Sequence, residues 1–157
     1  MDLIKQISEE IASISKEESI PHSQAFIIWI LEQYYTLSRD EAINVLTDSN
    51  ADKRIDAFIE REDSVVIVQS KLFEDSQKKV GEKEISIFKG CIDWLKQPDE
   101  IQKLNLPKLY DASMTFVEKW NSGANVELHY FAFGKFSSGA NQERKVFNNS
   151  DSRDRIQ

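Results

Sequence analysis

The chain has 157 residues, of which 40% are hydrophobic and 30% charged, and its formal net charge is −7. This length suits one domain with a buried core, and the single cysteine, Cys91, excludes an internal disulfide framework. No apolar run approaches the roughly 18 residues of a membrane span and no signal peptide opens the chain, so we expect no membrane partner and a cytoplasmic location. The acidic balance excludes a broadly basic surface, so nucleic-acid binding would need a local basic strip.

Two helices are predicted at the start of the chain. The first is an amphipathic helix of about four turns, because its apolar residues recur at helical spacing: Leu3, Ile4, Ile7, Ile11 and Ile14. The second begins near Pro21 and covers residues 22–36, with apolar residues around most of its circumference. Glu32 lies in this apolar run, where a carboxylate must reach solvent or find a partner.

A short capped segment precedes a hairpin. Ser38 is a plausible N-cap with Glu41 as its capping-box partner, and residues 43–47 either continue that helix or form a first strand. Residues 48–52 form a polar turn. Strands are then predicted at 55–59 and 65–71, joined by a charged turn at 61–64.

Three different polar groups converge at the end of this hairpin. With the turn centred on Glu62 and Asp63, Asp56 falls opposite Gln69, and the period of two puts Lys71 on the same face. The opposite face is then apolar, with Ile55, Ala57, Val66 and Val68. A carboxylate, an amide oxygen and an ammonium on one face are typical of a metal-dependent phosphodiesterase. A cross-strand ion pair between Asp56 and Lys71 is the structural alternative.

The second half of the chain predicts two more helices. A long amphipathic helix covers residues 80–97 and ends at Pro98; its lysines, which include Lys83 and Lys89, form either a solvated face or a phosphate-contacting strip. Within it, Cys91 is expected to be a small buried hydrophobe rather than a nucleophile. Another helix covers residues 110–120, and Gly123 stops it.

A last strand and a polar tail complete the chain. Residues 126–133 predict a strand interior to the sheet, in which His129 is a structural histidine. We therefore expect an α/β domain at residues 1–136, with a mixed sheet of about four strands flanked by helices and a last strand that can run parallel to its neighbour. Residues 137–157 are predicted to be a polar segment leading into a downstream domain of a longer parent chain.

The hairpin resembles that of the PD-(D/E)XK nuclease superfamily, the restriction-endonuclease-like fold, in a form with Gln in place of Glu. The closer resemblance is to the N-terminal domain of abortive-infection phage-resistance (AIPR) proteins, and it is firmest over residues 26–72. The matching segments are the aromatic helix at 26–35, Thr47-Asp48, Ile55-Asp56-Ala57 and Gln69-Ser70-Lys71. The chain departs from that family just before Ile55, where Lys53 and Arg54 replace the usual Gly-Gly.

This resemblance implies a Mg²⁺-dependent endonuclease, with Mn²⁺ as a substitute, that cleaves nucleic acid in phage defence, with double-stranded DNA as the expected substrate. The implied metal ligands are Asp56, Gln69, the Ser70 carbonyl and Glu32, with Asp48 or Asp52 as alternatives to Glu32. Lys71 would orient the attacking water or stabilise charge on the phosphate, which makes Asp56, Gln69, Lys71 and Glu32 the implied catalytic set. The expected nucleic-acid contacts are Lys53, Arg54, Lys83 and Lys89.

In a second interpretation the chain has the nuclease fold but no catalytic activity. The acidic charge and the Lys53-Arg54 departure favour a catalytically inactive nuclease-fold module that serves as a protein–protein interaction or scaffold domain. The position of Glu32 relative to Asp56 discriminates between the two interpretations. Whether the chain forms a homodimer is left open.

Overall fold

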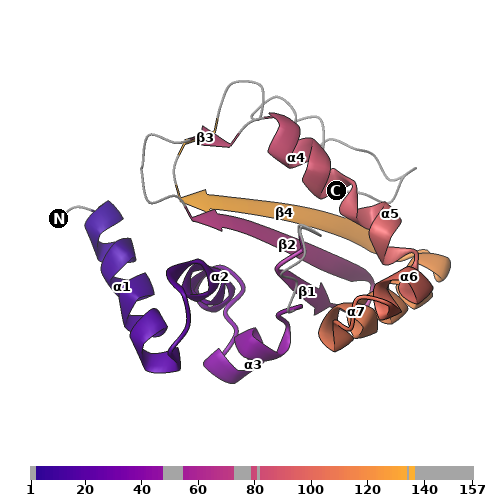
Figure 1. Ribbon diagram of the computed structural model, residues 1–157, viewed down its shortest axis with the longest axis horizontal. Coiled ribbons are helices and arrows are strands. Elements are labelled where there is room, and N and C mark those ends of the chain that lie inside the picture. Colours follow the sequence, from indigo (N-terminus) through magenta and orange to yellow (C-terminus); the bar gives the residue numbers. More distant parts are fainter. Residues whose placement is uncertain (1–2, 48–54, 73–78, 81, 134, 137–157) are drawn as a thin grey trace.

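A three-stranded mixed sheet lies at the centre of the molecule, with helices on both sides (Figure 1). This computed structural model describes residues 3–47, 55–72, 79–80, 82–133 and 135–136. The helices are α1 (Leu3–Glu18), α2 (His22–Gln33), α3 (Arg39–Asn44), α4 (Glu82–Lys89), α5 (Cys91–Leu95), α6 (Pro98–Gln102) and α7 (Pro107–Asn121). The strands are β1 (Ala57–Glu60), β2 (Ser64–Leu72), β3 (Lys79–Val80), β4 (Asn125–Phe133) and β5 (Lys135–Phe136). No helix in these ranges has the length and apolar character needed to cross a membrane.

The sheet has the order β1-β2-β4, and β2 is its central strand. β1 and β2 form the predicted antiparallel hairpin, and the expected register holds from Ala57 opposite Val68 to Glu60 opposite Val65. The predicted pairing of Asp56 with Gln69 was wrong, because Asp56 bonds to Val68 instead. β4 pairs with β2 in parallel, as the long crossover allows. Among the described residues β4 is an edge strand, so the prediction of an interior last strand was wrong. The sheet described has three strands, and β3 and β5 form a separate two-stranded pair, so about four strands in one sheet is not confirmed.

A β-bulge lies where the chain enters β1. The amide of Asp56 donates to the carbonyl oxygen of Val68 at 2.8 Å, while Ala57 is also the register partner of Val68, so two residues oppose one. The extra residue shifts the alternation of side chains. As a result Ile55 packs with Phe58 on one face of the sheet, not with Ala57 on the other as the simple period predicted.

Each face of the sheet covers its own apolar core. Helices α1, α2 and α3 pack against Ala57, Val66 and Val68, and they lie below the sheet in Figure 1. The opposite face, with Phe58, Ile67 and residues of β4, packs against apolar residues of α4 to α7. Because both faces are covered, the middle of β2 is a continuous buried run at residues 65–68.

Capping residues, glycine and proline explain the boundaries of α3, α4, α5 and α6. The capping box at α3 is present, with Ser38 accepting from the Glu41 amide and Glu41 accepting from the Ser38 amide. The predicted single helix over 80–97 is instead two helices with Gly90 between them, since glycine is a weak helix former, and Val80 belongs to β3. Pro98 does not end a helix but occupies the first turn of α6, where a missing N–H is harmless.

Gly123 sets the turn from α7 into β4, with φ of +87°. We expect Gly123→Ala to lower the free energy of unfolding by about 1–2 kcal/mol, because a Cβ disfavours the left-handed region even though none of the described atoms would lie within 4 Å of it. Urea denaturation measures the change. Gly123→Asn is the matched control, since asparagine tolerates this region, and an equal loss in both variants would contradict the explanation.

Candidate functional site

A pocket of about 410 Å³ lies where the bulge meets the C-terminal end of β2. Its lining includes Asp56, Gln69, Ser70 and Lys71. The Asp56 carboxylate bonds to the hydroxyl of Ser70, and strand alternation directs Ser70 to the sheet face opposite that of Gln69 and Lys71, so the prediction of one shared face for Asp56, Gln69 and Lys71 is not borne out. The opposite wall comes from the first turns of α2 and the residue before them.

The Asp56 carboxylate continues the hydrogen bonding of the sheet beyond the end of β1. Its Oδ2 accepts from the Ser70 amide at 2.7 Å and from the Ser70 hydroxyl at 3.0 Å. In a regular ladder the Ser70 amide would bond to the carbonyl oxygen of Ile55, but the bulge turns that carbonyl to Thr47, whose hydroxyl donates to it at 2.7 Å. The bulge and Thr47 therefore bring the Asp56 side chain to the edge of β2.

Gln69 lines this pocket, and strand alternation puts its side chain on the sheet face of Val65 and Ile67, opposite the face that carries Ser70 and packs against α2. The residue is 6% exposed, and its Nε2 donates to the Ser70 carbonyl at 3.3 Å. Its Oε1 is buried and has no hydrogen-bond partner within the described residues. A buried carbonyl without a donor costs free energy, so this atom is placed to accept from a ligand or to bind a cation.

Lys71 is exposed and lies two residues beyond Gln69, on the same face of β2. Lys71 therefore adds a positively charged residue to the lining of the pocket.

The structure does not bring Glu32 to this site. Its carboxylate accepts from the guanidinium of Arg39 at 3.0 Å, in a cluster that also contains Glu17 and Glu18. This environment raises the pKa of Arg39, chiefly through the hydrogen bond to Glu32. Glu32 lies eight residues after Gln24 in α2, which is about 12 Å along the helix axis. The sequence indicated that Glu32 must reach solvent or find a partner, but not that Arg39 of α3 is that partner.

The other predicted residues are not part of the pocket as described. Asp48, Asp52, Lys53 and Arg54 lie outside the described residues. Lys83 lies in the first turn of α4, and Lys89 at the end of α4 is half-buried and does not line the pocket. In the described part of the chain no group of three His, Cys, Asp or Glu side chains is placed to hold a metal.

Sequence reasoning missed the residues that α2 contributes. Ser23, Gln24 and Ile27 line the pocket from the start of this helix. Their spacing of three and four residues puts them on one helical face, which is a readable signal. The sequence alone did not show that this face meets the end of β2, because that contact is long-range.

The oxygen-rich lining fits a divalent cation in part. The donors are the Asp56 carboxylate, the Gln69 Oε1 and the Ser70 carbonyl, which the strand alternation turns toward the Asp56 side of β2. Mg²⁺ prefers oxygen ligands and is commonly held by one or two carboxylates together with substrate phosphates. One carboxylate in the described lining therefore fits a cation that binds together with a phosphate.

His129 lies away from this pocket and is a structural residue, as predicted. Its Nδ1 is hydrogen-bonded to the hydroxyl of Tyr35, and its Nε2 lies 3.5 Å from a Glu127 carboxylate oxygen. Burial lowers the pKa of His129, and burial also raises the pKa of Tyr35. Cys91 is buried as expected, and its burial raises the pKa of the thiol, which makes it a poor nucleophile.

The chain matches no protein-family model, no curated protein and no solved structure.

Gln69→Leu should raise the free energy of unfolding by about 1 kcal/mol in metal-free buffer, because it removes a buried carbonyl that has no partner. Guanidinium denaturation with a chelator present measures this. Gln69→Glu is the control of similar size, and it should lower stability because it places a second carboxylate near Asp56. A loss of stability in Gln69→Leu would show that the lost Nε2–Ser70 hydrogen bond outweighs the cost of burying Oε1.

Stability should fall as the pH drops below about 6.5, the ordinary pKa of histidine. The folded state lowers the pKa of His129, so the unfolded state binds more protons, and the stabilisation present above pH 6.5 is lost as the pH falls through the lower folded pKa. Unfolding free energies at pH 7.5 and 5.5 test this. The difference between the two pH values should shrink in His129→Phe, and an unchanged difference would assign the effect to other groups.

Proposed function

We propose that this pocket is the active site of a metal-dependent nuclease that hydrolyses phosphodiester bonds, with DNA as its expected substrate. The observation that carries the proposal is a pocket lined by Asp56, Gln69, Ser70 and Lys71, in which Ser70 donates two hydrogen bonds to the Asp56 carboxylate. The buried Gln69 Oε1, which has no partner within the described residues, adds to it. The antiparallel hairpin that holds them, with the parallel third strand, supports a restriction-endonuclease-like arrangement. The resemblance to AIPR proteins adds a role in phage defence.

In this proposal the acidic and neutral residues bind the metal and the basic residue stabilises charge on the substrate. Asp56 and Gln69 supply oxygen ligands, and Ser70 holds the Asp56 carboxylate in place through two hydrogen bonds. A bound Mg²⁺ or Mn²⁺ would lower the pKa of a water molecule and stabilise charge on the phosphate. Lys71 lines the same pocket and stabilises the negative charge that builds up on the phosphate oxygens as water attacks phosphorus and the ester P–O bond breaks.

The inactive-module interpretation draws support from two features. The Asp56 carboxylate has a structural task in the apo protein, since it satisfies the Ser70 amide, and Glu32 is engaged by Arg39. A domain with these contacts could keep the fold for binding alone. Metal binding without cleavage would be the signature of this second function.

We expect Mn²⁺ or Mg²⁺ to raise the melting temperature, because the ion binds the folded state preferentially. Asp56→Asn and Gln69→Leu should abolish this rise, whereas Lys71→Ala should retain it, because Lys71 is not a metal ligand. Thermal denaturation at several ion concentrations measures the effect. A rise that survives Asp56→Asn would place the ion elsewhere.

Cleavage of plasmid DNA in low salt with Mn²⁺ completes this test. Lys71→Ala should slow cleavage on the order of 10²–10³-fold while leaving the metal effect intact. Glu32→Gln is a matched control, since it should leave cleavage unchanged despite altering the Arg39 cluster. Equal cleavage by wild type and Lys71→Ala would assign the activity to a contaminant, and metal binding with no cleavage by wild type would favour the inactive module.

A further inference from the structure

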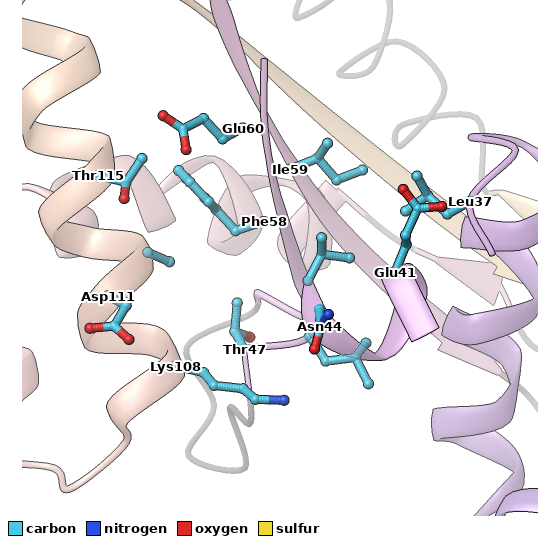
Figure 2. A pocket seen from close by; sticks show the side chains of 13 residues that line it. Leu37, Glu41, Asn44, Thr47, Phe58, Ile59, Glu60, Lys108, Asp111 and Thr115 are labelled. Carbon is cyan, nitrogen blue, oxygen red and sulfur yellow. The ribbon is translucent and has the colours of Figure 1, made fainter. Parts of the chain in front are cut away.

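A second cavity, of about 480 Å³, opens on the other side of the hairpin, at the outer edge of β1. Figure 2 shows that side chains of α7 (Lys108, Asp111 and Thr115) face those of β1 (Phe58 and Glu60) across it. The remaining wall comes from α3 and the segment that follows it, including Glu41 and Asn44. The proposed nuclease chemistry does not use this cavity.

The floor of the cavity contains an incomplete sheet edge. The segment after α3 pairs with the start of β1 on this side: the Thr47 amide donates to the Asp56 carbonyl at 3.1 Å and the Phe58 amide to the Val45 carbonyl at 2.9 Å. Before Val45 the chain turns away into α3, so this pairing stops halfway along β1.

Unused backbone groups remain beyond that point. In an antiparallel ladder, alternate residues direct both their N–H and C=O groups to the same side. The backbone N–H and C=O groups of Phe58 point away from β2. Those of Glu60 point the same way, because the amide of the next residue, Arg61, donates toward the hairpin, to the Ser64 carbonyl at 2.8 Å. No hydrogen bond to the Phe58 carbonyl or to the Glu60 amide is present in the described part of the chain. Such an edge is a template for an added strand.

The charged side chains that line this edge are mostly acidic, so they favour a positively charged ligand. Three carboxylates, those of Glu41, Glu60 and Asp111, line the cavity together with one ammonium, that of Lys108. The Lys108 ammonium donates to the Ile43 carbonyl at 3.4 Å. The Lys119 ammonium forms an ion pair with the Glu60 carboxylate and also donates to the carbonyls of Arg61 and Glu62 in the turn. The lining is therefore net acidic, with Phe58 and Ile59 providing apolar surface between the charges.

We propose that this cavity binds an extended basic peptide segment of a partner protein, which adds a strand to the outer edge of β1. The peptide backbone bonds to the Phe58 carbonyl and the Glu60 amide, while alternate Lys or Arg side chains reach Glu41, Glu60 and Asp111. Intervening small apolar side chains contact Phe58 and Ile59. Charge complementarity selects this occupant, because a second copy of a chain with net charge −7 would bring a predominantly acidic surface to an acidic cavity.

A labelled peptide that alternates lysine and valine is the probe, and fluorescence anisotropy with the full chain measures its binding. Asp111→Lys should weaken binding about threefold to tenfold, and added salt should weaken it further. Glu9→Lys changes the charge equally on exposed α1, outside the cavity, and should leave binding near the wild-type value. Equal losses in the two variants would show non-specific attraction and overturn the proposal.

Backbone hydrogen exchange by NMR tests the strand addition itself. On peptide binding, the Glu60 amide should become protected, whereas the Ile59 amide, which the ladder directs inward toward β2, should change little. A peptide N-methylated at alternate positions should lose this protection. Binding without protection of Glu60 would overturn strand addition, and concentration-dependent protection without peptide would identify a second copy as the occupant instead.

Discussion

The bond from the Ser70 amide to the Asp56 carboxylate is the contact on which the arrangement of this molecule depends. The backbone N–H and C=O groups on both edges of a central strand need hydrogen-bond partners, and β2 extends four residues past Val68, the partner of the first residue of β1. The carboxylate takes the place of a main-chain carbonyl at that position. The carbonyl of Ile55, which a regular ladder would direct to Ser70, instead accepts from the Thr47 hydroxyl.

The Asp56 side chain satisfies a backbone donor of the sheet and also lines the pocket of the proposed site, together with Gln69 and Lys71. The neighbouring Gln69 does the opposite: its Oε1 carries a desolvation cost that the apo protein does not recover. A buried acceptor kept at a cost is expected where binding, rather than folding, has selected the residue.

Sequence reasoning succeeded where a local signal determined the outcome. The hairpin register followed from the turn and the alternation of β2, and the capping box at Ser38 was readable from four residues. It failed where a contact between distant segments decided the position of a residue. The bulge moved Ile55 to the other face, Arg39 captured Glu32, and α2 rather than a further acid supplied the opposite wall of the pocket. Each of these depends on how elements pack, which periodicity does not encode.

The parallel pairing of β2 with β4 has a consequence for the order of folding. The hairpin partners of β2 are close in sequence, but β4 pairs residue for residue with β2 from Ser64–Asn125 onward, across the whole intervening crossover. Closing that long loop is slow compared with hairpin formation, so the chain passes through a stage in which one edge of β2 is open. That edge belongs to the most apolar β-branched run of the protein, Val65 to Val68. During synthesis and refolding, intermolecular pairing therefore competes with the arrival of β4 for the same hydrogen bonds, and a higher protein concentration favours aggregates over the folded chain.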